Sequence, residues 1–278
     1  MKQKKLLSTI GTVFFTILCF TWVLPVLIVL MDSFKSRTFI SLQPFNFLTE
    51  QTFVGLENYM QAIDYYGFLD AVGWTVFITV GSVFVILICC SMCAWFITRV
   101  ANRFTKGVYL LCVLSMVVPF QMVMFTLSLV ADRLGLSTPW GIIIVYLGFG
   151  AGLAVFMFCG FVKSIPIEIE EAALIDGCSP IRTFFNVVLP IMKPTYISVA
   201  ILQAMWIWND FLLPYLVLDT TEYKTISIVI QFMKGSYGRV DMGAIMAALI
   251  MAVIPVVIFY LLCQKHIIKG VAAGAVKG

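Results

Sequence analysis

The sequence predicts an all-α polytopic membrane protein with six transmembrane helices, on two bulk properties and one pattern. Hydrophobic residues make up 62% of the 278 residues, charged residues only 12%, and the mean hydropathy is +1.04. A soluble domain carries about 25% charged residues, so most of this surface must face lipid. The pattern is a series of six long runs that carry almost no charge. We therefore expect residues 1–278 to form a single transmembrane domain.

Each of the six runs is long enough to cross a bilayer as a helix. About 20 apolar residues span the hydrocarbon core, and lipid offers no hydrogen-bonding partner to an open backbone. The first run follows three lysines, as a signal peptide would, but it exceeds the roughly 7–15 apolar residues of a cleavable signal. We expect it to be retained. The predicted helices are residues 10–31, 71–98, 107–131, 140–162, 195–218 and 242–263.

The distribution of lysine and arginine predicts the orientation. With both termini inside, twelve of these residues lie on the cytoplasmic side and six on the outer side. Cytoplasmic loops carry the excess of positive charge in multi-pass proteins, so this topology is favoured over its inverse. It places the loop of residues 163–194 in the cytoplasm. The net charge of +4 is too small to indicate a nucleic-acid partner.

The 163–194 loop contains the most specific sequence pattern in the chain. Glu171-Ala172-Ala173 is followed by three residues ending at Asp176, then Gly177, nine further residues, Val187, one residue, and Leu189-Pro190. Pro166 fits the first turn of a helix, Gly177 can end it in the left-handed conformation, and Ser179-Pro180 can start another. The loop is therefore predicted to hold two short helices joined by a sharp turn. Composition alone would also fit an ordinary amphipathic linker at the membrane surface.

This pattern resembles the cytoplasmic EAA loop of ABC-importer permeases, and the resemblance extends along the chain. Trp208-Asn209-Asp210-Phe211 with Pro214 is similar to a segment of the carbohydrate-uptake branch, as is the C-terminal segment of residues 270–278. Together with six spans, these features resemble the maltose permease G-subunit-like family. Cys178 departs from the alanine usual in that family.

The resemblance implies a type I ABC-importer permease fold in a prokaryotic cell membrane and transport of a sugar, with an oligosaccharide or disaccharide as the expected substrate. It implies four kinds of partner: a second homologous permease, two copies of a cytoplasmic ABC ATPase, an extracytoplasmic sugar-binding protein and the lipid bilayer. No phosphate-binding loop occurs in the sequence, so we expect no cofactor here, with ATP and magnesium used by the ATPase. The implied ATPase-coupling residues are Glu171, Ala172, Ala173, Asp176, Gly177, Leu189 and Pro190.

The fifth run carries the second candidate site. Asp210 is the only acid inside any of the six runs, and Gln203, Trp206 and Asp210 fall on one helical stripe beside Asn209. An intramembrane carboxylate costs roughly 2.5–3.5 kcal/mol on insertion scales, so it should face protein or water. An aromatic face beside amide and carboxylate acceptors suits a sugar ring. The stripe is either part of a translocation path or a polar clasp between helices, with Asn209 favouring the clasp.

Two other classes of protein fit the sequence less well. A secondary transporter or channel would also be a helical bundle, but coupling to ions predicts several intramembrane ionisable groups and often inverted repeats. A membrane-embedded enzyme would need paired carboxylates or an activated nucleophile, and none is evident, so we expect no catalytic residue. Nor do we expect a metal site. Cys90 and Cys93 are interpreted as small packing residues. A seam of small residues on one face of the same predicted helix supports this interpretation: Thr75, Thr79, Ser82, Cys89 and Cys93.

The segment between the fifth and sixth helices is predicted to face outward. It contains a turn-rich stretch at residues 234–238, and the resemblance implies that this loop meets the binding protein.

Overall fold

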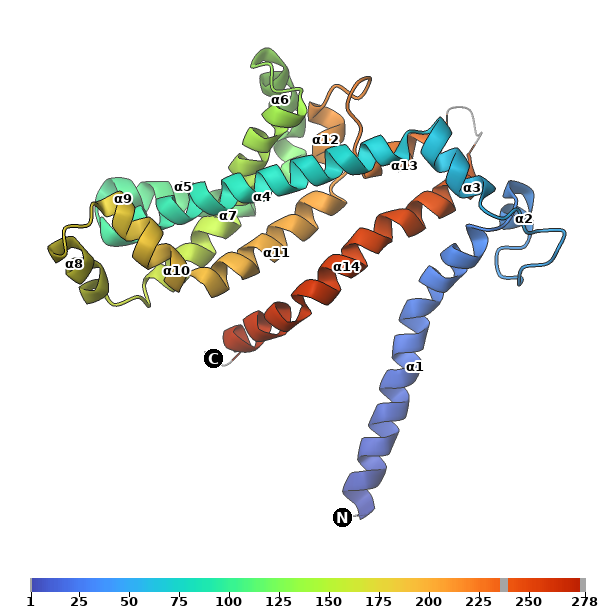
Figure 1. Cartoon of the computed structure of the whole chain (residues 1–278), viewed down its shortest axis with the longest axis horizontal. Helices are drawn as coiled ribbons and strands as arrows, with labels where there is room; N and C mark the ends of the chain where they lie inside the picture. The colour runs from blue at the N-terminus through green and yellow to red at the C-terminus, as the bar shows by residue number, and fades with distance from the viewer. Residues whose placement is uncertain (1, 236–239, 276–278) are drawn as a thin grey trace. The chain divides into compact units, whose positions relative to one another are not determined.

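The computed structural model describes the backbone of residues 2–235 and 240–275. Over this part of the chain the structure is helical, with one isolated bridge between Lys35 and Phe53 and no strand. The chain divides into two compact units (Figure 1), residues 1–69 with 229–257 and residues 70–228 with 258–278. Part of the turn-rich stretch predicted at 234–238 and the last three residues of the C-terminal segment lie outside the described residues.

Unit 1 contains short helices that follow a long apolar one. Its elements are α1 (Lys2–Asp32), α2 (Arg37–Leu42), α3 (Glu57–Met60), the π-helical turn η1 (Gln61–Tyr65), the end of α13 (Ile226–Phe232) and the first part of α14 (Met242–Ala275). None of the most apolar part of α1 is buried against the rest of the chain. That exposure suits a helix that meets lipid or another subunit.

A buried polar cluster holds the end of α1 in unit 1. Lys35 is fully buried, and its Nζ lies 2.7 Å from Asp32 Oδ1 and donates to the backbone oxygens of Gln43 and Pro44. Asn58 Nδ2 donates to the carbonyl oxygens of Ser33 and Lys35, both at 2.8 Å. We call Asp32, Lys35 and Asn58 the local node. A buried charge needs such pairing, because an isolated one loses its hydration without compensation.

Unit 2 contains the main apolar core. Its elements are α4 (Phe68–Arg99), α5 (Arg103–Val117), α6 (Phe120–Arg133), α7 (Pro139–Val162), α8 (Ile167–Ile175), α9 (Pro180–Thr183), the π-helical turn η2 (Phe184–Val188), α10 (Leu189–Ile191), α11 (Lys193–Asn209) and α12 (Leu212–Val217). Helix α7 packs against both α5 and α11, and α12 packs against α6. The short helices α8, α9 and α10 gather at one end of α4 (Figure 1).

The buried face of α4 differs by one position from the predicted seam. Thr75, Thr79 and Ser82 are buried as expected, but the face continues through Ile86 and Cys90, while Cys89 is exposed. A step of four residues turns the buried face by about 40° in one direction, whereas the step of seven from Ser82 to Cys89 turns it by about 20° in the other. All eight cysteines are free.

Four of the six predicted spans are continuous helices, and two are broken. By length and composition, α1, α4, α7 and α14 can each cross a membrane, and two bent helix pairs raise the number of candidate spans to six. The run predicted as one helix over 107–131 is instead α5 and α6, which meet at 109°. Val118 is extended and Pro119 caps α6, because proline disfavours helical backbone in the residue before it.

The run predicted as one helix over 195–218 is also broken. Helix α11 ends at Asn209, Asp210 takes an extended backbone with ψ 133°, and α12 begins at Leu212. Pro214 explains the break, because it has no N–H for the Asp210 carbonyl four residues earlier. In α12 Pro214 lies in the first turn, where a missing N–H costs no helical hydrogen bond. A second bend of 78° separates residues 180–191 from α11.

Candidate functional site

The loop between α7 and α11 begins with helix α8. Pro166 is its N-cap, one residue before the first-turn position that the sequence predicts, and Glu168 and Glu170 lie in the first turn. Acidic side chains are favourable there because they face the positive end of the helix dipole. The sequence of the first turn therefore favours a helix that starts at this point.

Gly177 ends α8 with a reversal that only a left-handed residue permits. Its φ is +83°, its N–H donates to the Leu174 carbonyl, and the Cys178 N–H donates to the Ala173 carbonyl. This pair of bonds is the Schellman motif. A Cβ at Gly177 would meet no atom within 4 Å, so the backbone conformation, not lack of space, requires glycine here.

The second limb of the loop runs through α9, η2 and α10. Ser179 Oγ accepts from the Arg182 N–H at 3.3 Å, and Pro180 occupies the start of α9, as the sequence predicts. Phe184 and Val188 are buried, Leu189 is half-buried and Pro190 is exposed. The limb therefore rests on the core through one face and leaves the other free.

The outer surface of α8 combines acidic and apolar side chains. Glu171, Ala172, Asp176 and Gly177 are exposed, and Ala173 is half-buried. Ile175 is 85% exposed. A large aliphatic side chain left this open, beside carboxylates and small residues, gives the surface the character of a contact site for another protein.

Glu170 points the opposite way from Glu171. It is 5% exposed and forms an ion pair with Arg99 at the end of α4, with Nη2 and Oε1 2.7 Å apart. Successive helix residues are about 100° apart, so adjacent glutamates cannot share one face. The sequence alone did not predict this ion pair.

Gln203 belongs to α11 and faces α7. It is buried, and its Nε2 donates to the Gly150 carbonyl at 3.0 Å. A Cβ on Gly150 would come within 2.6 Å of Ile86 Cδ1 and 3.1 Å of Gln203 Oε1. Gln203 is therefore one member of a polar clasp between two helices.

Trp206 and Asp210 meet at a third residue, Tyr146. The Tyr146 hydroxyl donates to Asp210 Oδ2 at 3.1 Å, and its ring lies edge-on to Trp206 with centroids 5.5 Å apart. Asp210 Oδ1 accepts from the Leu212 N–H at 3.0 Å and so satisfies the first N–H of α12, one residue before its N-cap Phe211. Trp206 is 40% exposed, which leaves part of its ring open.

Asn209 differs from the other three. Its side chain is exposed and donates to the Met205 carbonyl of its own helix at 2.7 Å. Within the part of the chain that the structure describes, this side chain bonds to its own helix, whereas the sequence favoured a clasp between helices. The structure thus brings Trp206 and Asp210 together through Tyr146, sets Gln203 one turn away along α7, and leaves Asn209 apart.

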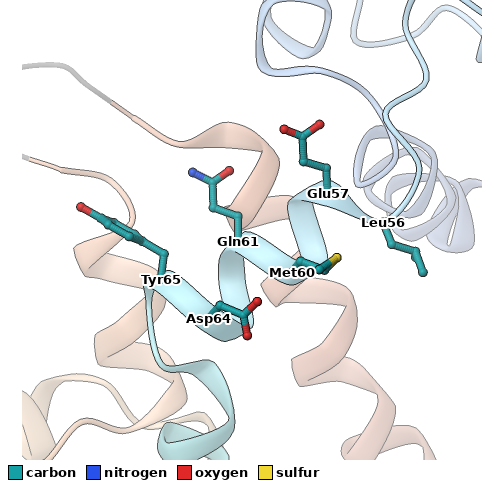
Figure 2. Close-up of a pocket in the computed structure, with 6 residues that line it drawn as sticks. All are labelled: Leu56, Glu57, Met60, Gln61, Asp64 and Tyr65. Atoms are coloured by element: carbon teal, nitrogen blue, oxygen red, sulfur yellow. The ribbon is translucent and has the colours of Figure 1, made fainter.

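Unit 1 carries a separate surface depression, which holds none of the predicted site residues. Figure 2 shows it along α3 and η1, with Glu57 and Gln61 pointing to the same side. Its remaining lining is Leu56, Met60, Asp64 and Tyr65. All six residues come from one short helical segment, so the depression is an open surface rather than an enclosed cavity.

A family model and curated relatives both match the chain. Residues 88–273 match the family described as the binding-protein-dependent transport system inner membrane component. The probable starch degradation products transport system permease protein AmyC of Thermoanaerobacterium thermosulfurigenes is 39% identical over 99% of this chain and 97% of its own length. The multiple sugar-binding transport system permease protein MsmG of Streptococcus mutans is 33% identical over 99% of this chain and 96% of its own length.

A solved structure shares the fold. It belongs to a bacterial ABC transporter involved in the import of the acidic polysaccharide alginate, and the match has a TM-score of 0.79. The identity is 20%, over 95% of this chain and 98% of the other. At that identity the likeness supports the type I ABC-importer permease fold, to which the described helices conform.

These matches cover the candidate loop, the polar stripe and most of the spans. Members of this family are membrane components of importers that depend on a binding protein and an ATPase, and they are transporter subunits rather than enzymes. A multi-pass location in the cell membrane follows from the family and from the apolar helices. The chain belongs to the family of binding-protein-dependent transport system inner membrane components and is the permease subunit of an ABC importer.

Proposed function

We propose that this permease forms half of a translocation path for an oligosaccharide or disaccharide, beside a second homologous permease. Two copies of a cytoplasmic ABC ATPase would drive it with ATP and magnesium, and an extracytoplasmic binding protein would deliver the sugar. The names of the relatives support the substrate class: starch degradation products, multiple sugars and, at 28% identity over the whole chain, arabinooligosaccharides.

The observation that carries the ATPase contact is the outward face of α8. Glu171 and Asp176 offer exposed carboxylates, and the exposed Ile175 offers apolar surface. Complementary charge would set the register of docking, while burial of Ile175 would supply most of the affinity. Ala172 and Ala173 would allow close approach, and Gly177 would keep the two limbs at a fixed angle. Leu189 would hold the second limb to the core, and the exposed Pro190 would add to the contact surface.

The topology that this role requires has both termini and the 163–194 loop in the cytoplasm. Charge counting favours it. A cysteine at Asp64 should then react with an impermeant maleimide on intact cells, whereas a cysteine at Asp176 should react only after permeabilisation. Both positions are exposed. Labelling of the native cysteines is subtracted, and the reverse order of reaction would exclude the topology.

For the sugar path we propose Trp206, Asn209 and Asp210 as wall residues, with Gln203 positioning α11 against α7. The partly open ring of Trp206 can stack on a sugar face, and the exposed amide of Asn209 can bond to hydroxyls. Trp206→Ala should then lower uptake while binding-protein-stimulated ATP hydrolysis persists. Loss of assembly, with normal transport in the complex that survives, would make the stripe a clasp only.

The substrate class is tested by uptake in a strain deleted for this chain and restored with it. The radiolabelled panel contains maltotriose, raffinose, arabinotriose, diacetylchitobiose and, as a non-sugar control, histidine. Restored uptake of a panel sugar supports the proposal. Uptake of histidine, or of no panel sugar, contradicts it.

Docking is tested by Glu171→Lys and Gly177→Asp in the assembled complex. Charge reversal opposes a complementary surface, and a side chain at the left-handed residue strains the turn. Both variants should reach the membrane and lose the co-purifying ATPase. Glu50→Lys, the same reversal at an exposed glutamate elsewhere, is the matched control. Normal ATPase recovery and transport in both variants would refute the docking role.

A further inference from the structure

One face at the end of α4 holds both limbs of the 163–194 loop. Trp95 and Arg99 are four residues apart on this helix and therefore share a face. α4 is a helix of 32 residues that is long and apolar enough to span the bilayer. Any element that contacts these two side chains is therefore connected to a membrane-spanning helix.

The grip on the first limb is a fully bonded carboxylate. Glu170 Oε1 accepts from Arg99 Nε at 3.0 Å and Nη2 at 2.7 Å, and Oε2 accepts from Trp95 Nε1 at 2.9 Å. Arg99 Nη2 also donates to the Ile165 carbonyl at 2.9 Å, just before α8. Charge-assisted bonds of this kind are stronger and more directional than neutral ones, particularly where water is excluded.

The grip on the second limb is aromatic. The ring centroids of Trp95 and Phe184 are 5.4 Å apart, and Phe184, which belongs to η2, is fully buried. Helix α8 itself approaches α9 and η2 closely through its backbone, whereas its link to α4 is made by these long side chains. The side chains of Trp95, Arg99 and Glu170 are thus the connection between the loop and the spanning helix; we call them the loop joint.

Glu170 and Glu171 face two different contact surfaces. Glu171 is exposed on the surface proposed for the ATPase, and Glu170 is turned inward to the membrane part of the same chain. We propose that the loop joint transmits movement of the docked loop to α4, so that Trp95, Arg99 and Glu170 are positioning residues that couple ATP hydrolysis to sugar movement. This inference rests on the proposed role of the loop as the ATPase contact.

The joint makes a prediction that docking alone does not. A complex with a weakened joint keeps its ATPase and hydrolyses ATP when loaded binding protein is added, yet moves less sugar for each ATP. In Glu170→Gln the lost charge and the amide's own donors disrupt the bonds to Arg99 and Trp95, and we expect uptake to fall about tenfold, the scale of one charge-assisted hydrogen bond. Trp95→Phe keeps an aromatic ring beside Phe184 and removes one donor, so uptake should fall about threefold.

The measurement uses the whole complex, purified through a tag on this chain and reconstituted in vesicles with its binding protein. Uptake of radiolabelled maltotriose, or of another panel sugar that the native complex imports faster, is divided by ATP hydrolysed. Glu168→Gln is the matched control, because Glu168 is an exposed glutamate in the first turn of the same helix. It should keep the native ratio.

Each other outcome contradicts the proposal. A native ratio in Glu170→Gln would show that the joint does not transmit movement. Loss of the ATPase from Glu170→Gln would make Glu170 a docking residue, like Glu171. If Glu170→Gln, Arg99→Lys and Trp95→Phe all fail to accumulate in the membrane, the cluster is a structural clasp. Failure of the docking proposal is separate, because it is read from ATPase recovery in Glu171→Lys.

Discussion

Two ion pairs are buried among the described residues, and they connect the chain over very different distances. In the local node, Asp32 and Lys35 are three residues apart, and Lys35 also bonds to the backbone of Gln43 and Pro44. In the loop joint, Arg99 and Glu170 are 71 residues apart and belong to a spanning helix and a loop helix. Each pairs a carboxylate with a cationic side chain, but the elements that the two pairs join are different.

The difference indicates two kinds of work. An ion pair within one short stretch of chain fixes the fold of that stretch, so its loss should lower the stability. A pair between two elements that can move also fixes their relative position, so its loss should be felt as coupling. Buried pairs are weak sources of net stability, because desolvation offsets much of the attraction, yet removing one partner alone is costly. The local node should therefore respond to substitution in a different observable from the loop joint.

The largest expected effect is at Lys35. Lys35→Met leaves the Asp32 carboxylate, 2% exposed, without its cation and should destabilise the protein by about 3–5 kcal/mol. Two quantities are measured: the amount of the protein in the membrane and its thermal unfolding in detergent. Asp32→Leu combined with Lys35→Met removes both charges and should recover much of the loss. If Lys35→Met accumulates normally but imports less sugar per ATP, the distinction between the two pairs fails.

The second largest effect tests whether the local node can accommodate an added methyl group. A Cβ on Gly243 would lie 2.2 Å from Asn58 Oδ1, and Asn58 is held by two 2.8 Å hydrogen bonds. Gly243→Ala should therefore destabilise the protein by about 1–3 kcal/mol, as overpacking does elsewhere. Gly73→Ala, on an open face of α4, is the control and should be neutral or stabilising, since alanine favours helix. Equal unfolding temperatures for the two variants would show that Asn58 is free to move.

The contrast also shows what a sequence can foresee. Pro166, Gly177 and Ser179-Pro180 predicted a helix, a left-handed turn and a second helix, because caps and turns are set by neighbouring residues. The six runs predicted the spans, because lipid imposes their length. Counting apolar residues missed the breaks at Pro119 and Asp210, although the prolines responsible were visible in the sequence.

Contacts between elements were not foreseeable in the same way. Tyr146, Trp95 and Arg99 became partners of Asp210 and Glu170 through the rotation of each helix about its axis, which depends on all the packed side chains together. The adjacent glutamates at 170 and 171 were the one usable signal, since they had to face different ways. Gln203 and Trp206 lie on one helix as the stripe predicted, Asp210 lies just beyond its end, and only the structure supplied α7 as the opposite face.

A smaller effect is expected where a polar contact in unit 2 has a second support. Tyr146→Phe removes the hydroxyl that donates to Asp210 Oδ2, while Oδ1 keeps its bond to the Leu212 N–H. The loss should be about 1–2 kcal/mol, the cost of one unpaired acceptor in a partly buried site. Thermal unfolding measures it, with Tyr215→Phe at an exposed ring as the control. An unchanged unfolding temperature would mean that water replaces the hydroxyl.

The smallest effect is expected at Gly150, and it contrasts with Gly243. A Cβ on Gly150 would meet the far end of the Ile86 side chain at 2.6 Å and Gln203 Oε1 at 3.1 Å. A terminal methyl can rotate away, whereas an amide held by two bonds cannot, so the same substitution faces a softer neighbour. The strain should largely cancel the helical gain of alanine over glycine, and Gly150→Ala should change stability by less than about 1 kcal/mol. Gly150→Ala with Ile86→Val, which removes the crowding methyl, should be at least as stable as Ile86→Val alone. A loss as large as that of Gly243→Ala, unrelieved by Ile86→Val, would place the obstruction at Gln203 and make the α7–α11 clasp as rigid as the local node.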